Sequence, residues 1–158
     1  IVFQSYALYP HLTVEENKGL QVAIEGHDPD RESARILELA SKLGLEGRLR
    51  AFPHELSGGE MQRASIARAL IGGQPLLLCD EPTGNLAQAA GREVMEELRR
   101  ACDQDGRTVV LVTHNPRDAA FADRVLLLVD GEIRPDGEQE GPRIEEADIA
   151  AALSRFSI

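Results

Sequence analysis

The sequence predicts an α/β fold in which a largely parallel sheet lies beside a helical lobe. Two short, continuous apolar runs, Leu76–Cys79 and Thr108–Val112, are typical of parallel strands that are buried on both faces. A helical pattern at Gln88–Cys102 separates these two runs. Strands that alternate with helices indicate a mainly parallel sheet. The earlier part of the chain carries helical patterns alone and is expected to form the lobe.

Three helices are predicted before the first apolar run. Thr13 and Glu16 have the spacing of a capping box, which predicts a helix start at this point. Ser33–Leu43 has helical periodicity and is followed by Gly44, a residue typical of helix C-termini. The third helix is expected at Glu60–Ile71, where apolar residues share one face. Those residues are Met61, Ala64, Ala67, Leu70 and Ile71.

After the second apolar run, the sequence predicts a short helix, a strand, a turn, a linker and a final helix. A short helix is predicted at Pro116–Ala122, and a further strand of the sheet at Val125–Val129. Asp130 and Gly131 follow that strand and are typical turn residues. The polar, glycine-containing segment Gly137–Pro142 reads as a linker. An amphipathic helix is expected after it, at 144–156.

The composition of the chain favours some classes of protein function and argues against others. The chain has 158 residues, 42% of them hydrophobic, which is enough for one domain with a packed core. Its net charge of -10 argues against nucleic-acid binding through phosphate contacts, which needs a basic surface. Cys79 and Cys102 lack the spacing of a disulfide framework, which favours a reducing compartment. No apolar run has the length of a membrane span. The first residue is Ile1, so the natural start is expected upstream.

The loop Leu56–Glu60 precedes the third predicted helix and is a candidate anion site. Gly58 and Gly59 let the backbone approach a ligand closely. A helix start also offers free N–H groups and a positive dipole end to a negative charge, and Ser57 adds a hydroxyl donor. A serine N-cap with a glycine turn is common without any ligand, so the loop alone leaves both interpretations open.

Two adjacent acids, Asp80 and Glu81, follow the apolar run Leu76–Cys79. The carboxyl ends of parallel strands form the edge at which open sheets bind ligands. Asp80 is suited to hold Mg²⁺ there, directly or through water. Glu81 is suited to take a proton from an attacking water. A solvated strand end is the simpler alternative, although two acids directly after a buried run disfavour it.

His114 and Gln4 occupy comparable positions after other strands. His114 lies just past the run Thr108–Val112 and is expected at the same sheet edge as Glu81, where it can contact a terminal phosphate. Gln4 follows a strand end read at Ile1–Phe3 and can bind Mg²⁺ and position water. Each of the two, taken alone, is more simply an ordinary loop residue.

The order of these motifs resembles the ATPase domain of ABC transporters, from Ile1 to about Ile133. The run Asp80–Leu86 is similar to the bacterial branch that serves lipoprotein-release, macrolide-export and FtsX-type permeases. The matching motifs are Gln4 (Q-loop), Leu56–Glu60 with Met61-Gln62-Arg63 (signature), Leu76–Glu81 (Walker B with the catalytic glutamate), Pro82–Leu86 (approach to the D-loop) and His114 (switch histidine).

The resemblance implies a P-loop NTPase-like fold and a head-to-tail dimer that uses ATP and Mg²⁺ as cofactors. The signature loop, Ser57–Glu60, then binds the ATP held by the partner subunit. On their own subunit, Asp80 and Gln4 serve as ligands of Mg²⁺. The catalytic residues that the resemblance implies are Glu81, His114 and Gln4.

The same resemblance implies a domain organisation and partners. Residues 1–136 correspond to a partial ABC ATPase domain, and residues 137–158 to a linker and a C-terminal helix. Within the domain, the helical lobe covers about 13–72, and the catalytic core covers strands at 1–4 and 76–133. The lobe is expected to meet an integral membrane permease, and a second ATPase subunit completes the dimer. The protein is therefore expected in the cytoplasm, peripheral on the inner face of the cell membrane.

Two features depart from the family's pattern. Residues 1–158 contain no G-x-x-x-x-G-K-S/T motif, so the family's P-loop is expected upstream of Gln4. The chain by itself is therefore expected neither to hydrolyse ATP nor to bind it tightly. Ala87 stands where the family has its D-loop aspartate, so weaker coupling between the two ATP sites is expected.

Two other functions fit part of the pattern. A non-hydrolysing regulatory subunit would also lack a P-loop and the D-loop aspartate. An SMC-type DNA-repair ATPase shares the signature and Walker B motifs. Such an ATPase needs long coiled coils between its halves, whereas the segment from Gln4 to Ser57 is short and has no sustained heptads. A P-loop encoded upstream would favour the hydrolysing enzyme over the regulatory subunit.

Overall fold

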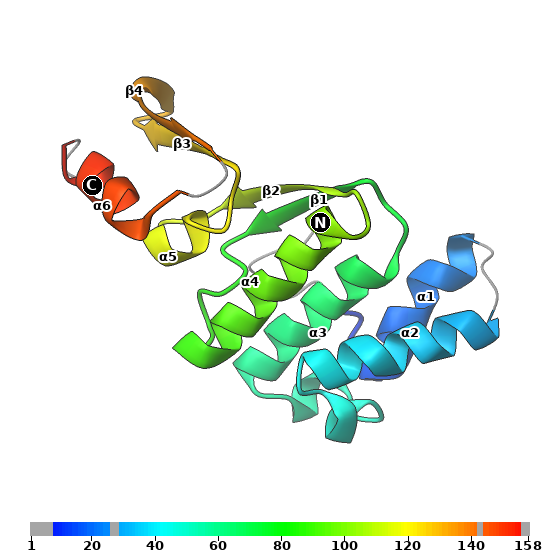
Figure 1. The fold of residues 1–158 in the computed structure, drawn as a ribbon. Coiled ribbons are helices and arrows are strands. Elements are labelled where there is room, and N and C mark those ends of the chain that lie inside the picture. Colours follow the sequence, from blue (N-terminus) through cyan, green and yellow to red (C-terminus); the bar gives the residue numbers. More distant parts are fainter. Residues whose placement is uncertain (1–7, 26–28, 142–143, 156–158) are drawn as a thin grey trace. The chain divides into compact units, whose positions relative to one another are not determined.

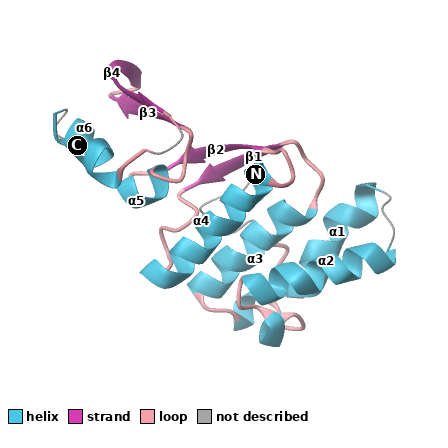
Figure 2. Ribbon diagram, viewed as in Figure 1, coloured by secondary structure: helices cyan, strands magenta, loops and turns pink. Residues whose placement is uncertain are grey.

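The computed structural model describes residues 8–25, 29–141 and 144–155, which belong to two compact units (Figure 1). The first unit is Ile1–Val112 and the second is Thr113–Ile158. The boundary that the sequence predicts at 136/137, between the ATPase domain and a linker with its helix, stays a prediction. Helices and strands occur in both units (Figure 2). None of the described helices has both the length and the apolar character needed to cross a bilayer.

Helix α3 is central to the first unit, where it packs against α1, α2 and α4 (Figure 1). The predicted helical character of the N-terminal part is confirmed. The elements of this unit are α1 (Val14–Glu25), α2 (Pro29–Lys42), α3 (Gly58–Ile71), β1 (Leu76–Asp80), α4 (Gln88–Asp103) and β2 (Thr108–Val112), with 3₁₀ turns at Glu46–Arg48 and Pro53–Glu55.

The residues predicted to start α1 and to end α2 have the hydrogen bonds and the backbone angle that these roles require. Glu16 Oε2 accepts a hydrogen bond from the backbone N–H of Thr13 at 2.8 Å, and Thr13 Oγ1 accepts one from the N–H of Glu16 at 3.3 Å. This reciprocal capping box satisfies two free donors at the start of α1. Gly44, just after α2, has a φ of 61°, a conformation that glycine adopts without steric cost. Both predicted helix ends are therefore confirmed.

Helix α3 is buried on more sides than its apolar pattern predicts. Met61 and Ile71 are only partly buried, although the pattern assigns both to the inner face. Because three helices surround α3, polar and small side chains on its other faces are buried as well. The additional buried residues are Gln62, Ser65, Ile66 and Ala69.

Strands β1 and β2 pair in parallel, with Asp80 opposite Val112. Figure 1 shows α3 and α4 on one side of this pair. Leu77 and Cys79 are each only 2% exposed, but the side chains that alternate with them along the strand are exposed to solvent. The prediction that both strands are buried on both faces is therefore wrong for the described residues, because their helices cover one face. The exposed apolar side chains are Leu76, Leu78, Val110 and Val112.

In the second unit, the predicted strand is confirmed but pairs differently. Strands β3 and β4 form an antiparallel hairpin rather than an extension of the parallel sheet. Asp130 and Gly131 turn the hairpin with φ values of 50° and 80°, which matches the predicted turn. The elements of this unit are α5 (Pro116–Ala119), β3 (Arg124–Val129), β4 (Glu132–Glu140) and α6 (Glu146–Arg155).

The predicted linker at Gly137–Pro142 is wrong over its first part, because residues up to Glu140 belong to β4. A strand forms there despite the polar sequence, since its backbone pairs with β3 and Glu138 bonds to Arg124 Nε at 2.6 Å. The final helix is confirmed as α6. It contributes to the small core of this unit, which consists of Val125, Leu127, Ile144, Ile149 and Ala152.

Lys18, on α1, is a buried cation. Its side chain is 0% exposed, and its Nζ has no hydrogen-bond partner among the described residues. Burial lowers the pKa of Lys18 to about 8 from its ordinary 10.5, and the charge of Glu15 opposes that shift only in part. The folded state therefore carries an unfavourable charge at neutral pH.

We expect Lys18→Met to stabilise the protein at pH 7. Below pH 8 both the folded and unfolded states bind the proton, so the folded state bears the full cost of the buried charge. Between pH 8 and 10.5 only the unfolded state keeps the proton, so stability rises with pH across this window. The gain at pH 7 should be about 3 kcal/mol. Urea unfolding at several pH values measures it.

Lys42→Met is the matched control, because Lys42 is a partly exposed lysine that is already paired with Glu38. It should give little change and leave the rise above pH 8 intact. Destabilisation by Lys18→Met at pH 7, or a wild-type stability that is flat between pH 8 and 10.5, contradicts the assignment.

Candidate functional site

Glu81, directly after β1, is held in an unusual backbone conformation. Its φ of 45° lies in the left-handed region that residues with a Cβ rarely adopt. The N–H of Glu81 donates to the carbonyl of Val112 at 2.9 Å, and its own carbonyl accepts from the N–H of Gly84 at 3.2 Å. The Glu81 side chain is half-buried, and that of Asp80 is exposed. The backbone that carries both carboxylates is therefore held by hydrogen bonds at the edge of the sheet.

The start of the turn after Glu81 is buried and bonded to helix α3. Pro82 and Thr83 are buried, and the N–H of Leu86 donates to the carbonyl of Thr83 at 2.9 Å. Gln62, which is 0% exposed on α3, donates from Nε2 to the carbonyl of Pro82 at 2.9 Å. The strand end with its two acids is therefore tied directly to the helix that follows the signature loop.

Ser57 is the N-cap of α3 and forms a capping box with Glu60. Ser57 Oγ accepts from the N–H of Glu60 at 3.3 Å, while Glu60 Oε2 accepts from the backbone N–H and the hydroxyl of Ser57, each at 2.8 Å. Helix geometry leaves the N–H groups of Gly58 and Gly59 without acceptors inside α3. Those two amides are therefore open to an anion. The Ser57 hydroxyl must turn away from Glu60 to reach one.

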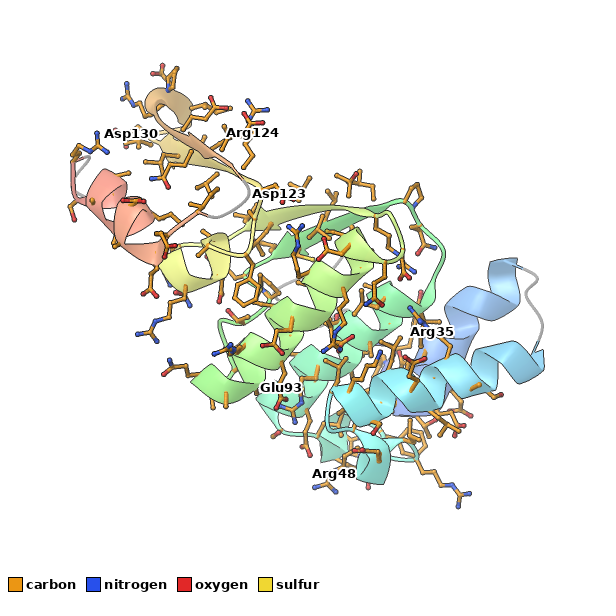
Figure 3. The ribbon with its side chains drawn as sticks, in the orientation of Figure 1. Arg35, Arg48, Glu93, Asp123, Arg124 and Asp130 are labelled. Atoms are coloured by element: carbon orange, nitrogen blue, oxygen red, sulfur yellow. The ribbon has the colours of Figure 1, made fainter. Side chains whose placement is uncertain are left out.

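Arg48 holds the other side of the Glu60 carboxylate. Its Nε donates to Glu60 Oε1 at 2.8 Å, and Figure 3 labels Arg48 on the first unit. The Arg48 hydrogen bond, followed by those from the backbone and hydroxyl of Ser57, lowers the pKa of Glu60 to about 2. Glu60 in turn raises the pKa of Arg48. The ionised Glu60 carboxylate thus holds the loop through its hydrogen bonds to Arg48 and Ser57. This supports an indirect role for Glu60 in binding a phosphate.

Gly59 lies close to the turn that follows Glu81. A Cβ added to Gly59 would meet Leu86 Cδ2 at 3.4 Å and the carbonyl oxygen of Asn85 at 3.7 Å. Both are ordinary van der Waals distances, so the chain's own packing accommodates an alanine at this position. A requirement for glycine here would therefore come from a ligand or a partner on the open side of the loop.

The structure brings some of the predicted site residues together within the first unit. The signature loop and the acids Asp80 and Glu81 are joined there through Gln62 and the turn 82–86. His114 is exposed and belongs to the second unit, so its position beside Glu81 stays a prediction. Gln4 lies outside the described residues, and its roles in binding Mg²⁺ and in catalysis stay predictions as well.

Asp80, the predicted ligand of Mg²⁺, is exposed at the carboxyl end of β1. In the described ranges, no group of three or more acidic, histidine or cysteine side chains could hold a metal by itself. Mg²⁺ in nucleotide sites is bound by one or two carboxylates and completes its coordination with water and substrate phosphates. The exposed Asp80 fits this mode, in which the ion arrives with the nucleotide.

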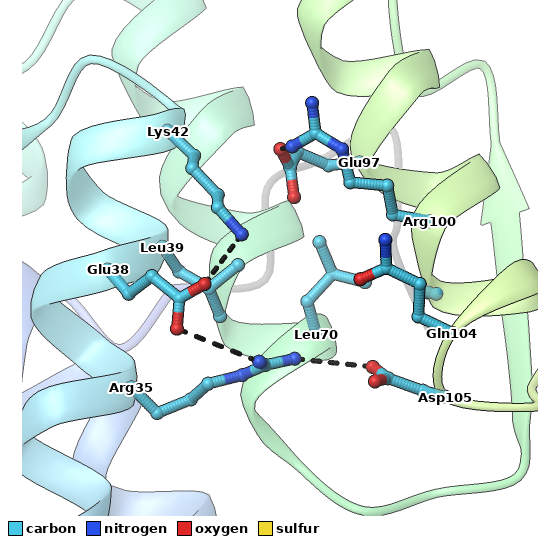
Figure 4. A pocket seen from close by; sticks show the side chains of 10 residues that line it. Arg35, Glu38, Leu39, Lys42, Leu70, Glu97, Arg100, Gln104 and Asp105 are labelled. Atoms are coloured by element: carbon cyan, nitrogen blue, oxygen red, sulfur yellow. Dashed lines mark hydrogen bonds and ion pairs between the residues drawn. The ribbon is translucent and has the colours of Figure 1, made fainter.

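A second polar feature, the pocket between α2 and the end of α4, is already neutralised (Figure 4). Lys42 Nζ lies 2.6 Å from Glu38, and Arg35 lies 3.2 Å from Asp105. These side chains are partly exposed, and such ion pairs stabilise a fold only weakly. The cations face acids of the same chain, so this pocket ties α2 to the end of α4 rather than offering a charged ligand site.

Two residues that shape the site were not singled out by the sequence. Gln62 appeared only as part of the signature, and its burial depends on the helices that surround α3 rather than on the apolar pattern. Arg48 gave no signal in the sequence. It lies in a 3₁₀ turn outside α3, and only the tertiary structure brings it to Glu60.

The comparison with protein families agrees with this site. The family described as ABC transporter matches residues 1–84, which is more than half of the chain. The chain belongs to the ABC transporter family. The matched part includes Gln4, the signature loop and both acids at the end of β1.

Among curated relatives, the chain is similar to macrolide export ATP-binding/permease proteins called MacB. MacB of Shigella flexneri is 45% identical over 149 residues, which cover 94% of this chain and 22% of the relative. MacB of Escherichia coli is 43% identical over 148 residues, again with 94% and 22% coverage. The chain thus spans about a fifth of the length of these relatives.

Two solved structures of ABC cassettes have the same fold. A dimeric bacterial ABC transporter cassette gives a TM-score of 0.80 at 37% identity, covering 88% of this chain and 61% of that chain. A dimeric ATP-binding cassette in a post-hydrolysis state, bound to ADP and Pi, gives 0.79 at 36% identity, with the same coverage. The predicted α/β fold of the P-loop NTPase type is therefore confirmed.

Ala87 is the N-cap of α4 but contributes no side-chain hydrogen bond to the helix. Its φ of -63° and ψ of 150° are ordinary for an N-cap, and the first turn of α4 contains no acid. Neither Ala87 nor the first turn of α4 therefore supplies a side-chain partner for the free N–H groups and the positive end of the helix dipole.

We expect Ala87→Asp to raise the free energy of unfolding by about 1 kcal/mol, because its carboxylate can accept from the first-turn N–H groups. Ala89→Asp is the matched control. It adds the same charge to the first turn without occupying the N-cap, so it should give only a few tenths of a kcal/mol. Equal effects of the two variants in urea unfolding would mean that Ala87 is not a capping position.

Proposed function

We propose that this chain is the ATP-binding part of an ABC exporter, which hydrolyses ATP at a head-to-tail dimer interface to drive a membrane permease. The observation that carries the proposal is the fixed position of Glu81. It follows the Mg²⁺ candidate Asp80, at the end of a parallel strand that is tied to the signature helix. The family match and the similarity to MacB proteins support the same function.

In this proposal, the residues of the chain divide the work of phosphoryl transfer. Asp80 holds Mg²⁺, and Glu81 takes the proton of the attacking water. His114 contacts the terminal phosphate, and Gln4 binds Mg²⁺ and positions the water. Mg²⁺ supplies charge neutralisation on the phosphates when it is bound. The P-loop, which residues 1–158 do not contain, holds the phosphates of ATP on the same subunit.

The signature loop acts on the nucleotide of the partner subunit. The open amides of Gly58 and Gly59 form an anion site at the start of α3, and both glycines are partly exposed. Two similar cassettes are described as dimeric, which supports this arrangement. Each ATP then lies between the acids of one subunit and the signature loop of the other.

The proposed partner is an integral membrane permease. The similar MacB proteins are named ATP-binding/permease proteins, and the chain spans about a fifth of their length. The part of the helical lobe at about residues 13–55 is proposed to contact the permease. The protein then lies on the inner face of the cell membrane, on the cytoplasmic side. Nucleic acid is not a proposed partner, since the chain has a net charge of -10.

One observation favours a second candidate function, a non-hydrolysing regulatory subunit. Ala87 replaces the aspartate of the family's D-loop and leaves α4 without a side-chain cap. The presence of Glu81 in a strained and well-supported conformation favours the hydrolysing enzyme, because such strain is usually retained at functional sites.

Glu81→Gln tests the proposed function in the full-length protein. We expect ATP turnover to fall by roughly 10²- to 10⁴-fold, because the general base is lost. Binding of Mg-ATP should be retained, because the phosphate ligands are unchanged. Glu93→Gln is the matched control, since Glu93 is exposed on α4 (Figure 3) and should leave turnover unchanged. Near-normal turnover of Glu81→Gln would remove Glu81 as the base, and an inactive wild-type protein would favour the regulatory subunit.

Trans action of the signature loop can be tested with defined heterodimers of the full-length protein. A Ser57→Arg subunit paired with a Glu81→Gln subunit combines both defects in one ATP site and leaves the other intact. We therefore expect this heterodimer to be more active than either mutant homodimer.

The matched control places both substitutions on one subunit and pairs it with a wild-type subunit. Trans action then puts one defect in each site, so this pair should be less active than the first. The reverse order of activities would show that the signature loop serves the ATP of its own subunit.

A further inference from the structure

Gln62 differs from the other buried polar residues because its side chain forms a hydrogen bond with the turn 82–86, which follows Glu81. The side chain is 0% exposed, and its Nε2 donates to the carbonyl of Pro82 at 2.9 Å. A proline carbonyl can only accept, so the NH₂ end of the amide must face it. Gln62 Oε1 has no hydrogen-bond partner among the described residues. The hydrogen bond to Pro82 therefore orients the amide within the part of the chain that the structure describes.

The residue that precedes Pro82 is under backbone strain. Glu81 has a φ of 45°, which persists only where the surroundings fix it. Bonds on both sides of its peptide unit supply that support: Val112 accepts from its N–H, and Gly84 donates to its carbonyl. The bond from Gln62 fixes the next carbonyl along the chain. Without it, the Pro82 peptide can rotate, and the strained conformation of Glu81 loses one of its restraints.

We propose that Gln62 is a positioning residue for Glu81. The proposal rests on the proposed function, in which Glu81 is the general base. Gln62 does not touch the reacting atoms. It acts by holding the turn, and since it lies one turn into α3, it also connects the signature loop to Glu81 of the same subunit. A change at Ser57–Gly59 on binding the partner's nucleotide can therefore reach Glu81 through α3 and Pro82.

The test uses Gln62→Met in the full-length protein, because methionine is similar in size and has no donor. We expect kcat for ATP hydrolysis to fall by roughly 10²-fold, as for a catalytic group displaced by about 1 Å, while KM for ATP and Mg-ATP binding stay unchanged. Ser65→Ala, a buried polar change on the same helix, should leave kcat unchanged. An unchanged kcat in Gln62→Met overturns the proposal.

A double-mutant cycle separates positioning from a general loss of structure. If Gln62 acts through Glu81, then Gln62→Met should not lower further the residual rate of Glu81→Gln. A multiplicative loss in the double variant overturns the proposal. If Gln62→Met does not fold, Gln62→Asn carries the same test, since its shorter amide no longer reaches Pro82. A wild-type protein without turnover instead contradicts the proposed function itself.

Discussion

The burial of α3 among three other helices is the constraint on which the candidate site depends. Because α3 is enclosed, Gln62 is carried into the interior and meets the carbonyl of Pro82. The same helix presents Ser57 and the two glycines at its start, where the fold leaves free N–H groups. The candidate anion site and the acid pair are thus joined in one packing arrangement through the hydrogen bond from Gln62 to Pro82.

Electrostatics acts on this framework at short range. Arg48 and Ser57 keep Glu60 charged and occupy both of its carboxylate oxygens with hydrogen bonds, which holds the shape of the loop. At the strand end, Asp80 is exposed and can bind a cation, while Glu81 is half-buried on a restrained backbone. The two neighbouring carboxylates therefore differ in exposure, in keeping with the different roles proposed for them.

Local signals were sufficient to predict much of the fold and to name the candidate site residues. The capping box at Thr13, the stop at Gly44 and the order of the motifs could all be predicted, because each depends on a few neighbouring residues. Features that depend on tertiary contacts could not. An apolar run such as Leu76–Cys79 does not tell whether one face or both will be covered, and the polar segment near Gly137 gave no sign of pairing with β3. The contact between Arg48 and Glu60 likewise joins two separate elements.

In the proposed dimer, the acids of one subunit and the signature loop of the other share one nucleotide. A crystal structure of the full-length Glu81→Gln protein with Mg-ATP tests this arrangement directly. We expect the γ-phosphate to accept hydrogen bonds, at roughly 3 Å, from the Gly58 or Gly59 amides of one subunit. We expect the Mg²⁺ of the same nucleotide to lie beside Asp80 of the other subunit. A nucleotide bound by the signature loop of its own subunit, or a signature loop left facing solvent, would contradict the proposed dimer.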